Sequence, residues 1–309
     1  MLPVPSRARR CAVSLRQRGL ALVAVLWIVV ALGILVGSIV AIAKSEIRAA
    51  QIRVQSVRTV ALGDAAIQLA VLDWQNAAPT PDRLMRAVYT FDGVDVAVEI
   101  VPATGYINLN NAQEPLLQAL FMTAAGLSAD EALTLAQRVI DWRDIDDAPM
   151  PQGAEAEQYF AAEVSWRPRN GRFLAPEDLM QVLGVDFDLF AIISPFVTAW
   201  SGAAGVNPLA APETVLGILC GGDASCVARI ATARDAGEIG IDTTMLEQSY
   251  LATGNVGNIL HVSASLPVEP GLRAVRERWV QLAADVDGSP WKTLRAEPVR
   301  FVAVSRNEF

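Results

Sequence analysis

The residues best suited to chemistry form one acidic run in the middle of the chain. Residues 141–159, DWRDIDDAPMPQGAEAEQY, include Asp141, Asp144, Asp146, Asp147, Glu155 and Glu157. Clustered carboxylate oxygens suit calcium better than zinc, because calcium takes six to eight oxygen ligands. The run is not an EF-hand, since its glycine and final glutamate do not fall at the required positions. The preferred calcium ligands are Asp144, Asp146, Asp147 and Glu155, with Asp141 turned inward to cap or pair. A solvated acidic loop is the alternative.

The same carboxylates also permit an enzymatic interpretation. Glycosidases place two carboxylates about 5–9.5 Å apart, and any cluster of acids contains such pairs. The chain has no G-x-S-x-G, H-E-x-x-H or glycine-rich phosphate loop. Its one histidine, His261, excludes multi-histidine metal sites and leaves little room for a catalytic triad. We therefore predict a protein without catalytic residues, and keep a signal-anchored periplasmic hydrolase as the alternative.

Helices and strands must position the acidic run, and their patterns alternate along the chain. Strand-like alternation occupies residues 94–101, 258–267, 271–283 and 291–301. Helical signals fill the region between the first two strands. These signals are the run Ala112–Ala125, a capping box of Ser128 and Glu131 before a helix to about Trp142, and prolines 176 and 212 in first turns. His261 is then a half-exposed strand residue, and residues 206–234 resemble a helix-hairpin-helix that serves packing.

An apolar segment near the N-terminus predicts a membrane anchor. Residues 20–43 carry no charge in 24 positions and would span about 36 Å as a helix. Five arginines and no acid precede this segment, so the N-terminus stays cytoplasmic and the remainder crosses the membrane. That remainder carries 20 basic and 33 acidic side chains, which disfavours nucleic acid as a partner. A plain signal anchor is the simpler interpretation of the same features.

The helix continues beyond the apolar segment. Apolar residues recur at spacings of three and four, which is typical of an amphipathic helix. They are Ile47, Ala50, Val54, Val57, Ala61, Ala65, Leu69 and Leu72. The prolines of NAAPTPD, residues 76–82, end the helix near Asn76.

The N-terminus resembles that of the type IV pilin class. The resemblance rests on the basic leader, the sequence Arg16-Gln17-Arg18-Gly19 and the uninterrupted apolar run. It implies that a prepilin peptidase cleaves between Gly19 and Leu20 and methylates the new N-terminus. Most members have glutamate at the fifth mature position, where this chain has Ala24. Minor pseudopilin K of type II secretion characteristically lacks that glutamate.

Four further motifs are similar to the minor pseudopilin K family and occur in the same order. They are GYINLNNA at 105–112, DWRDIDD at 141–147, GAEAEQY at 153–159 and VNPLAAPETVLGIL at 206–219. The resemblance implies an α+β, type IV pilin-like fold with a long N-terminal helix, an antiparallel sheet and a large inserted helical domain. The implied segments are a leader (1–19), a transmembrane helix (20–43), its amphipathic continuation (44–76), a first part of the sheet domain (77–106), the helical insertion (107–250) and C-terminal strands (251–309).

The resemblance also carries expectations about role and partners. It implies a non-catalytic subunit at the tip of a pseudopilus, anchored in the bacterial inner membrane with its head in the periplasm. Expected partners are minor pseudopilins I and J, the prepilin peptidase, the inner-membrane secretion assembly and secreted protein cargo. Calcium is the expected cofactor. Removal of the leader would remove Cys11, and the oxidising periplasm would then let Cys220 and Cys226 pair. Two buried free thiols are the alternative.

Overall fold

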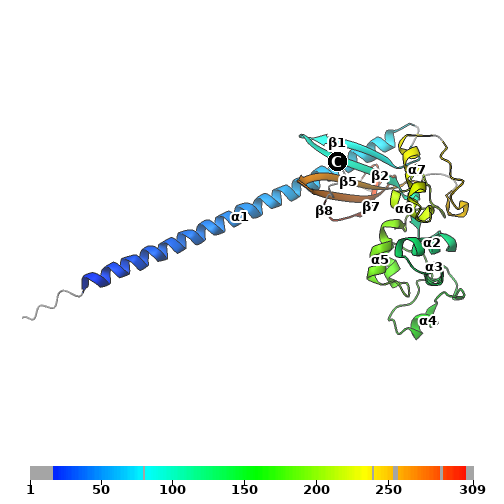
Figure 1. Cartoon of the computed structure of the whole chain (residues 1–309), viewed down its shortest axis with the longest axis horizontal. Helices are drawn as coiled ribbons and strands as arrows, with labels where there is room; N and C mark the ends of the chain where they lie inside the picture. Colours follow the sequence, from blue (N-terminus) through cyan, green and yellow to red (C-terminus); the bar gives the residue numbers. More distant parts are fainter. Residues whose placement is uncertain (1–16, 79–80, 239, 253–256, 286–287, 304–309) are drawn as a thin grey trace, which may run out of the picture. The chain divides into compact units, whose positions relative to one another are not determined.

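The computed structural model describes residues 17–78, 81–238, 240–252, 257–285 and 288–303. This part of the chain divides between Arg58 and Thr59 into two units. Helix α1 (Gln17–Asn76) is unbroken, so the apolar segment and the residues after it form one helix, as predicted (Figure 1). From Ala21 onward the helix is long and apolar enough to cross a membrane, by length and composition. The leader residues 1–16 lie outside the described residues.

A six-stranded antiparallel sheet is the frame of the second unit. Its order is β1-β2-β5-β6-β7, and β8 also pairs with β6. The strands are β1 (Met85–Phe91), β2 (Val94–Pro102), β5 (Ile259–Glu269), β6 (Leu272–Gln281), β7 (Lys292–Ala296) and β8 (Arg300–Ala303). The sequence pattern did not reveal β1, and the predicted strand over 291–301 is two strands. The α+β fold with its long helix and antiparallel sheet is confirmed.

Residues 59–76 of α1 cover one face of this sheet. Ala66, Ile67, Ala70, Val71 and Trp74 are buried there. Their partners on the sheet are Val96, Val98, Ile100, Leu260, Val262, Ala264, Leu266, Ala274 and Val280. Burial of this continuous apolar layer is the main driving force for docking the helix.

The predicted apolar stripe is wrong over this part of α1. Leu69 and Leu72 are 40% and 43% exposed. The buried side instead carries the larger Ile67, Val71 and Trp74 together with small residues, and the small residues let the sheet approach closely. At Gly63, for example, an added Cβ would lie 3.0 Å from Cβ of Arg276. The neighbouring Asp64 carboxylate binds Arg276 and Arg278 at 2.8 and 2.7 Å, which fixes the helix on β6.

The helical insertion lies between β2 and β5. Its elements are β3 (Ile107–Asn108), α2 (Glu114–Ala125), α3 (Ala129–Arg143), α4 (Ala156–Ala161), α5 (Phe187–Ile193), β4 (Val197–Thr198), α6 (Glu213–Leu219) and α7 (Ala224–Asp235). The predicted capping box at Ser128 and Glu131 is present at the start of α3. Between α4 and α5, the helix predicted at Pro176 is only a 3₁₀ segment, Pro176–Gln181. It ends at Gln181 because Val182 is extended. At its start, the Asp178 carboxylate accepts a hydrogen bond from the Leu174 N–H at 2.7 Å.

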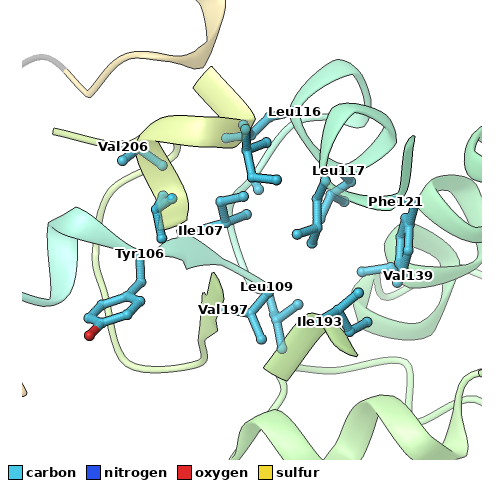
Figure 2. Packing of buried hydrophobic residues seen from close by; sticks show 14 of the residues in the cluster. Tyr106, Ile107, Leu109, Leu116, Leu117, Phe121, Val139, Ile193, Val197 and Val206 are labelled. Carbon is cyan, nitrogen blue, oxygen red and sulfur yellow. The ribbon is translucent and has the colours of Figure 1, made fainter. Parts of the chain in front are cut away.

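The insertion has its own apolar core. Leu116, Leu117 and Phe121 of α2 face Val139 of α3 and Ile193 of α5 (Figure 2). The four-residue sheet of β3 and β4 closes this core, with Ile107 paired to Val197. The acidic loop is therefore anchored to helices that belong to a packed apolar core.

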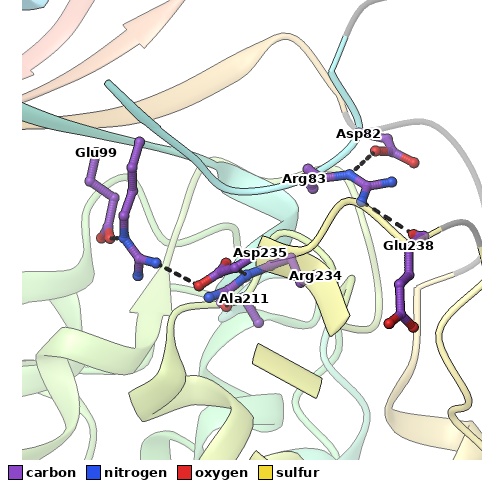
Figure 3. Close-up of polar contacts among 8 residues, drawn as sticks. Asp82, Arg83, Glu99, Ala211, Arg234, Asp235 and Glu238 are labelled. Atoms are coloured by element: carbon purple, nitrogen blue, oxygen red, sulfur yellow. Dashed lines mark hydrogen bonds and ion pairs between the residues drawn. The ribbon is translucent and has the colours of Figure 1, made fainter. Parts of the chain in front are cut away.

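A charged network joins the insertion to the sheet. Arg86 of β1 binds Glu99 of β2 and Asp235 of α7, each at 2.9 Å (Figure 3). Arg234, which is 1% exposed, donates to the Ala211 carbonyl at 2.7 Å and binds Asp235 at 2.8 Å. Helices α6 and α7 thus pack as a pair, and Asp235 links α7 to β1 of the sheet, which supports the packing interpretation of residues 206–234.

Candidate metal centre

The acidic run links two helices of the insertion. Asp144 is the C-cap of α3 and Glu155 is the N-cap of α4, so ten residues of loop separate them. Asp141, in the last turn of α3, is fully buried and accepts hydrogen bonds from the Met150 N–H at 3.2 and 3.3 Å. It is therefore turned inward and holds the loop to the helix, as the sequence analysis allowed.

Two carboxylates of the run have buried oxygens without protein partners. Glu155 is 3% exposed, and neither of its carboxylate oxygens has a hydrogen-bond partner. Asp144 has one such oxygen, Oδ1. A buried carboxylate without a donor is costly, since it has lost water and gained nothing in return. Protons, ordered water or a cation would stabilise this pair.

The electrostatics of the loop agree with that need. Burial, together with the charges of Asp141, Asp144, Asp147 and Asp146, raises the pKa of Glu155 to about 7. Burial, with the charges of Asp141 and Asp146, raises the pKa of Asp144 to about 6, although Arg143 opposes the shift. Burial also raises the pKa of Asp141 despite its backbone hydrogen bonds. Negative charge is thus crowded here beyond what the protein neutralises.

The other two predicted ligands lie on the exposed side of the loop. Asp146 Oδ1 accepts a hydrogen bond from the Ala148 N–H at 2.9 Å. Asp147 Oδ1 accepts one from Asn170 Nδ2 at 2.8 Å, and the same amide donates to the Asp146 carbonyl at 3.1 Å. The structure therefore couples Asp144 to Glu155 through their charges and ties Asp146 and Asp147 to their surroundings.

These residues fit a cation in part. Within the residues that the structure describes, no three acidic, histidine or cysteine side chains are grouped closely enough to bind one ion. Calcium, however, commonly completes its shell with backbone carbonyls and water. Asp144 and Glu155 supply the hard, unpaired oxygens that such an ion requires, so they are the pair best suited to hold it.

Two residues that position the site were not singled out from the sequence. Gly153 lies so close to Asp141 that an added Cβ would be 1.8 Å from Oδ2. Asn170 adopts a positive φ of 48° and links its own loop to the acidic run. The Asn170-Gly171 dipeptide is a turn signal that would have drawn attention to this position.

Two other predicted sites fall outside residues 141–159. Gly19 and Leu20 fall inside α1, but the leader before Gln17 is outside the described residues. In the second unit, Cys220 and Cys226 form a disulfide with a Cα–Cα distance of 5.9 Å. It bridges the turn between α6 and α7, which Gly221 and Gly222 make possible with positive φ angles.

Comparison with known proteins shows a similarity to one family over this region. Residues 99–202, which include β3, α2, α3 and the acidic run, match the family model described as type II secretion system, protein K. The resemblance to protein K is confirmed. The motif at residues 206–219 lies beyond the matched range.

Two known proteins extend the comparison. Type II secretion system protein K of Pectobacterium carotovorum subsp. carotovorum is 35% identical over 80 residues, 26% of this chain and 24% of that protein. The alignment thus spans about a quarter of that relative. A chain in the crystal structure of the GspK-GspI-GspJ complex of the type 2 secretion system from enterotoxigenic Escherichia coli has a TM-score of 0.52 and 18% identity. That likeness covers 81% of this chain and 98% of the other, so the two share a fold.

Proposed function

We propose that this chain is a minor pseudopilin K of a type II secretion system and acts without catalysis at the tip of the pseudopilus. The observation that carries the proposal is the helical insertion between β2 and β5 of a pilin-like frame. A subunit whose head is much wider than a helix, which is about 10–12 Å across, leaves no room for another subunit stacked above it. Ala24, in place of the usual glutamate, agrees with a subunit that has no upper neighbour.

The proposal includes placement and partners. The subunit lies in the bacterial inner membrane with one span, a cytoplasmic N-terminus and a periplasmic head. The prepilin peptidase removes residues 1–19 and methylates Leu20, and minor pseudopilins I and J join the mature subunit. The solved relative is in a complex with GspI and GspJ, which supports this choice of partners. Contact with the inner-membrane assembly and with secreted cargo follows from the same role.

The burial of Asp141 and Glu155 argues against the hydrolase alternative. Glycosidases need two carboxylates that reach a substrate in an open cleft. Glu155 is 3% exposed and Asp141 is fully buried, so neither can contact a sugar. A structural cation suits them better. Asp144 and Glu155 would hold calcium, which supplies the positive charge that the loop lacks.

Localisation in assembled pseudopili tests the proposal. Immunogold labelling with antibodies against the head should mark one end of each filament. The Ala24→Glu variant is compared with the wild type in the same experiment. A terminal subunit has no upper neighbour for the added carboxylate to contact, so the labelling of the variant should be unchanged. Label along the whole filament, or failure of the full chain to copurify with pseudopilins I and J in detergent, would contradict the proposal.

A further inference from the structure

The face of the sheet opposite α1 carries a row of acidic residues. The strand register places Arg86, Glu99, Ser263 and Glu277 opposite one another on four successive strands. Glu297 follows, since its N–H donates to the Glu277 carbonyl at 3.0 Å. Ser263 is the small residue in the middle of the row. It therefore forms the floor of a pit with a carboxylate on either side.

Two hollows, each of about 500 Å³, meet at this pit. One lies over β1 and β2, the other extends under the insertion, and both are lined by Glu99 and Ser263. Together they form a groove across the sheet, which we call the sheet groove. Neighbouring strands are about 4.8 Å apart, so four strands span about 14 Å, the length of about four extended residues. The sheet groove is therefore longer than a single small ion or amine, and its length suits a short extended peptide.

Charge in the sheet groove favours a cation. The hollow under the insertion is lined by Glu99, Glu177, Glu277 and Glu297 but only by Arg295 and Arg300. Arg295 is shared between Glu177 and Glu297, and Arg300 binds Glu277 at 2.5 Å. Glu99 shares Arg86 with Asp235. The acidic side chains thus outnumber their cationic partners.

The spacing of the two central carboxylates suits one basic side chain. Glu99 and Glu277 lie two strands apart, or about 10 Å between backbones, with Ser263 between them. Their side chains are 33% and 17% exposed, so both are partly desolvated but reachable. A charged group hydrogen-bonded in such a site binds more strongly than one in open water.

An aromatic wall closes one end of the pit. His261 is stacked on Trp279 with ring centroids 4.6 Å apart, and Trp200 lies 5.0 Å from Trp279. The insertion adds Pro176, Pro195 and Pro212 above them. Aromatic rings and prolines are favourable surroundings for the methylene stem of lysine or arginine and for its cation.

We propose that the sheet groove binds an extended polypeptide segment and receives one of its lysine or arginine side chains between Glu99 and Glu277. Three observations support this inference: the strand register that aligns Glu99, Ser263 and Glu277, the two hollows that share Glu99 and Ser263, and the excess of acidic over basic side chains. It does not depend on tip placement, because it concerns only the sheet and the insertion.

The single histidine of the chain gives a direct test. Full-length protein with isotope-labelled histidine in detergent micelles yields one set of ring signals, those of His261. The probe is a blocked tetrapeptide with one central arginine, and its matched control carries citrulline, which has nearly the same shape but no charge. The arginine peptide should move the His261 signals saturably, and the citrulline peptide should leave them in place.

Variants then locate the binding. Glu99→Gln and Glu277→Gln should each weaken the affinity for the arginine peptide by about tenfold. Asp92→Asn is the matched control, because it removes one exposed charge from the β1–β2 turn of the same sheet, and its affinity should stay within about twofold. Unperturbed histidine signals with the arginine peptide would overturn the proposal. So would equal binding of the citrulline peptide or undiminished affinity in both glutamine variants.

Discussion

Tyr106 and His261 are joined by a hydrogen bond of 2.8 Å between the phenol oxygen and Nδ1. Tyr106 belongs to the start of the insertion and His261 to β5, so the bond ties the inserted helices to the sheet. The imidazole is also stacked on Trp279, and its side chain is only 16% exposed. The histidine predicted as an ordinary half-exposed strand residue is thus part of the junction between the two layers.

This burial predicts a pH dependence of stability. Burial lowers the pKa of His261 from 6.5 to about 4, with Glu297 opposing the shift and Arg300 adding to it. The unfolded chain therefore binds a proton near pH 6.5, whereas the folded chain does not until about pH 4. His261 consequently makes the protein less stable as the pH falls through this interval.

The His261→Asn variant isolates this effect. Glu155 and Asp144 titrate in the same interval with raised pKa values and the opposite sign, so the wild type alone would not reveal it. The stability advantage of the wild type over the variant should shrink by up to about 1.4 kcal/mol for each pH unit between 6.5 and 4. Urea unfolding at a series of pH values measures this advantage, and a constant difference would contradict the prediction.

Calcium should stabilise the fold through Glu155. Full-length protein in detergent should unfold at a higher temperature with calcium than with chelator at equal ionic strength, because an ion that binds only the folded state stabilises it. Glu155→Gln should abolish this gain and should raise the midpoint in chelator, since it removes a buried charge. Exposed Glu157→Gln, two residues away, should keep the full response. Equal midpoints with and without calcium would leave the solvated loop as the correct interpretation.

Gly153→Ala should destabilise the insertion. The new methyl group would lie 1.8 Å from Asp141 Oδ2, so the loop must move away from α3. We expect a loss of about 1–3 kcal/mol in the free energy of unfolding, as for other overpacked sites. The control is Gly217→Ala in α6, where nothing lies within 4 Å of the added atom. This change should stabilise the helix by about 0.5–1 kcal/mol, and equal effects of the two variants would disprove the close contact.

The Cys220–Cys226 disulfide should form in exported protein. Alkylation under denaturing, non-reducing conditions should leave both thiols unlabelled, and labelling of both would refute the pairing. The Cys220→Ser, Cys226→Ser double variant should lose roughly 2 kcal/mol of stability, because the bridge closes only a short loop. Reduction of the wild type should produce the same loss, whereas reduction of the variant should change nothing.

Leader removal should depend on Gly19. Intact-mass analysis of membrane-purified protein should show Leu20 as the methylated first residue. A bulky residue at position 19 should block processing, since the peptidase must accept the side chain before the cut. Retention of Met1 in the wild type would rule out cleavage and favour a plain signal anchor.

The elements foreseen from the sequence are those with strong local signals. The alternation of Leu260, Val262 and Ala264 predicted β5, and the Ser128 capping box predicted the start of α3. The buried side of α1 was misjudged because Ala, Leu and Val occur on both sides of the helix after Thr59, so periodicity alone could not choose between them. Strand β1 was missed because its residues are mostly exposed.

The sites depended on tertiary structure that local patterns do not contain. Composition identified the acidic run, but not that Glu155 is buried without a partner while Asp147 binds Asn170. Likewise, Glu99 and Glu277 are far apart in sequence, and only the register through Ser263 brings them into one row.

The last residue of β2, Pro102, is paired directly with Leu260 near the start of β5. The chain thus leaves the sheet and returns to it at adjacent positions, although residues 103–258 intervene. A tight turn could connect the same two strands without changing the order or direction of any other. The antiparallel sheet is therefore topologically complete by itself, and such an insertion can be gained, lost or exchanged during evolution without rethreading the sheet.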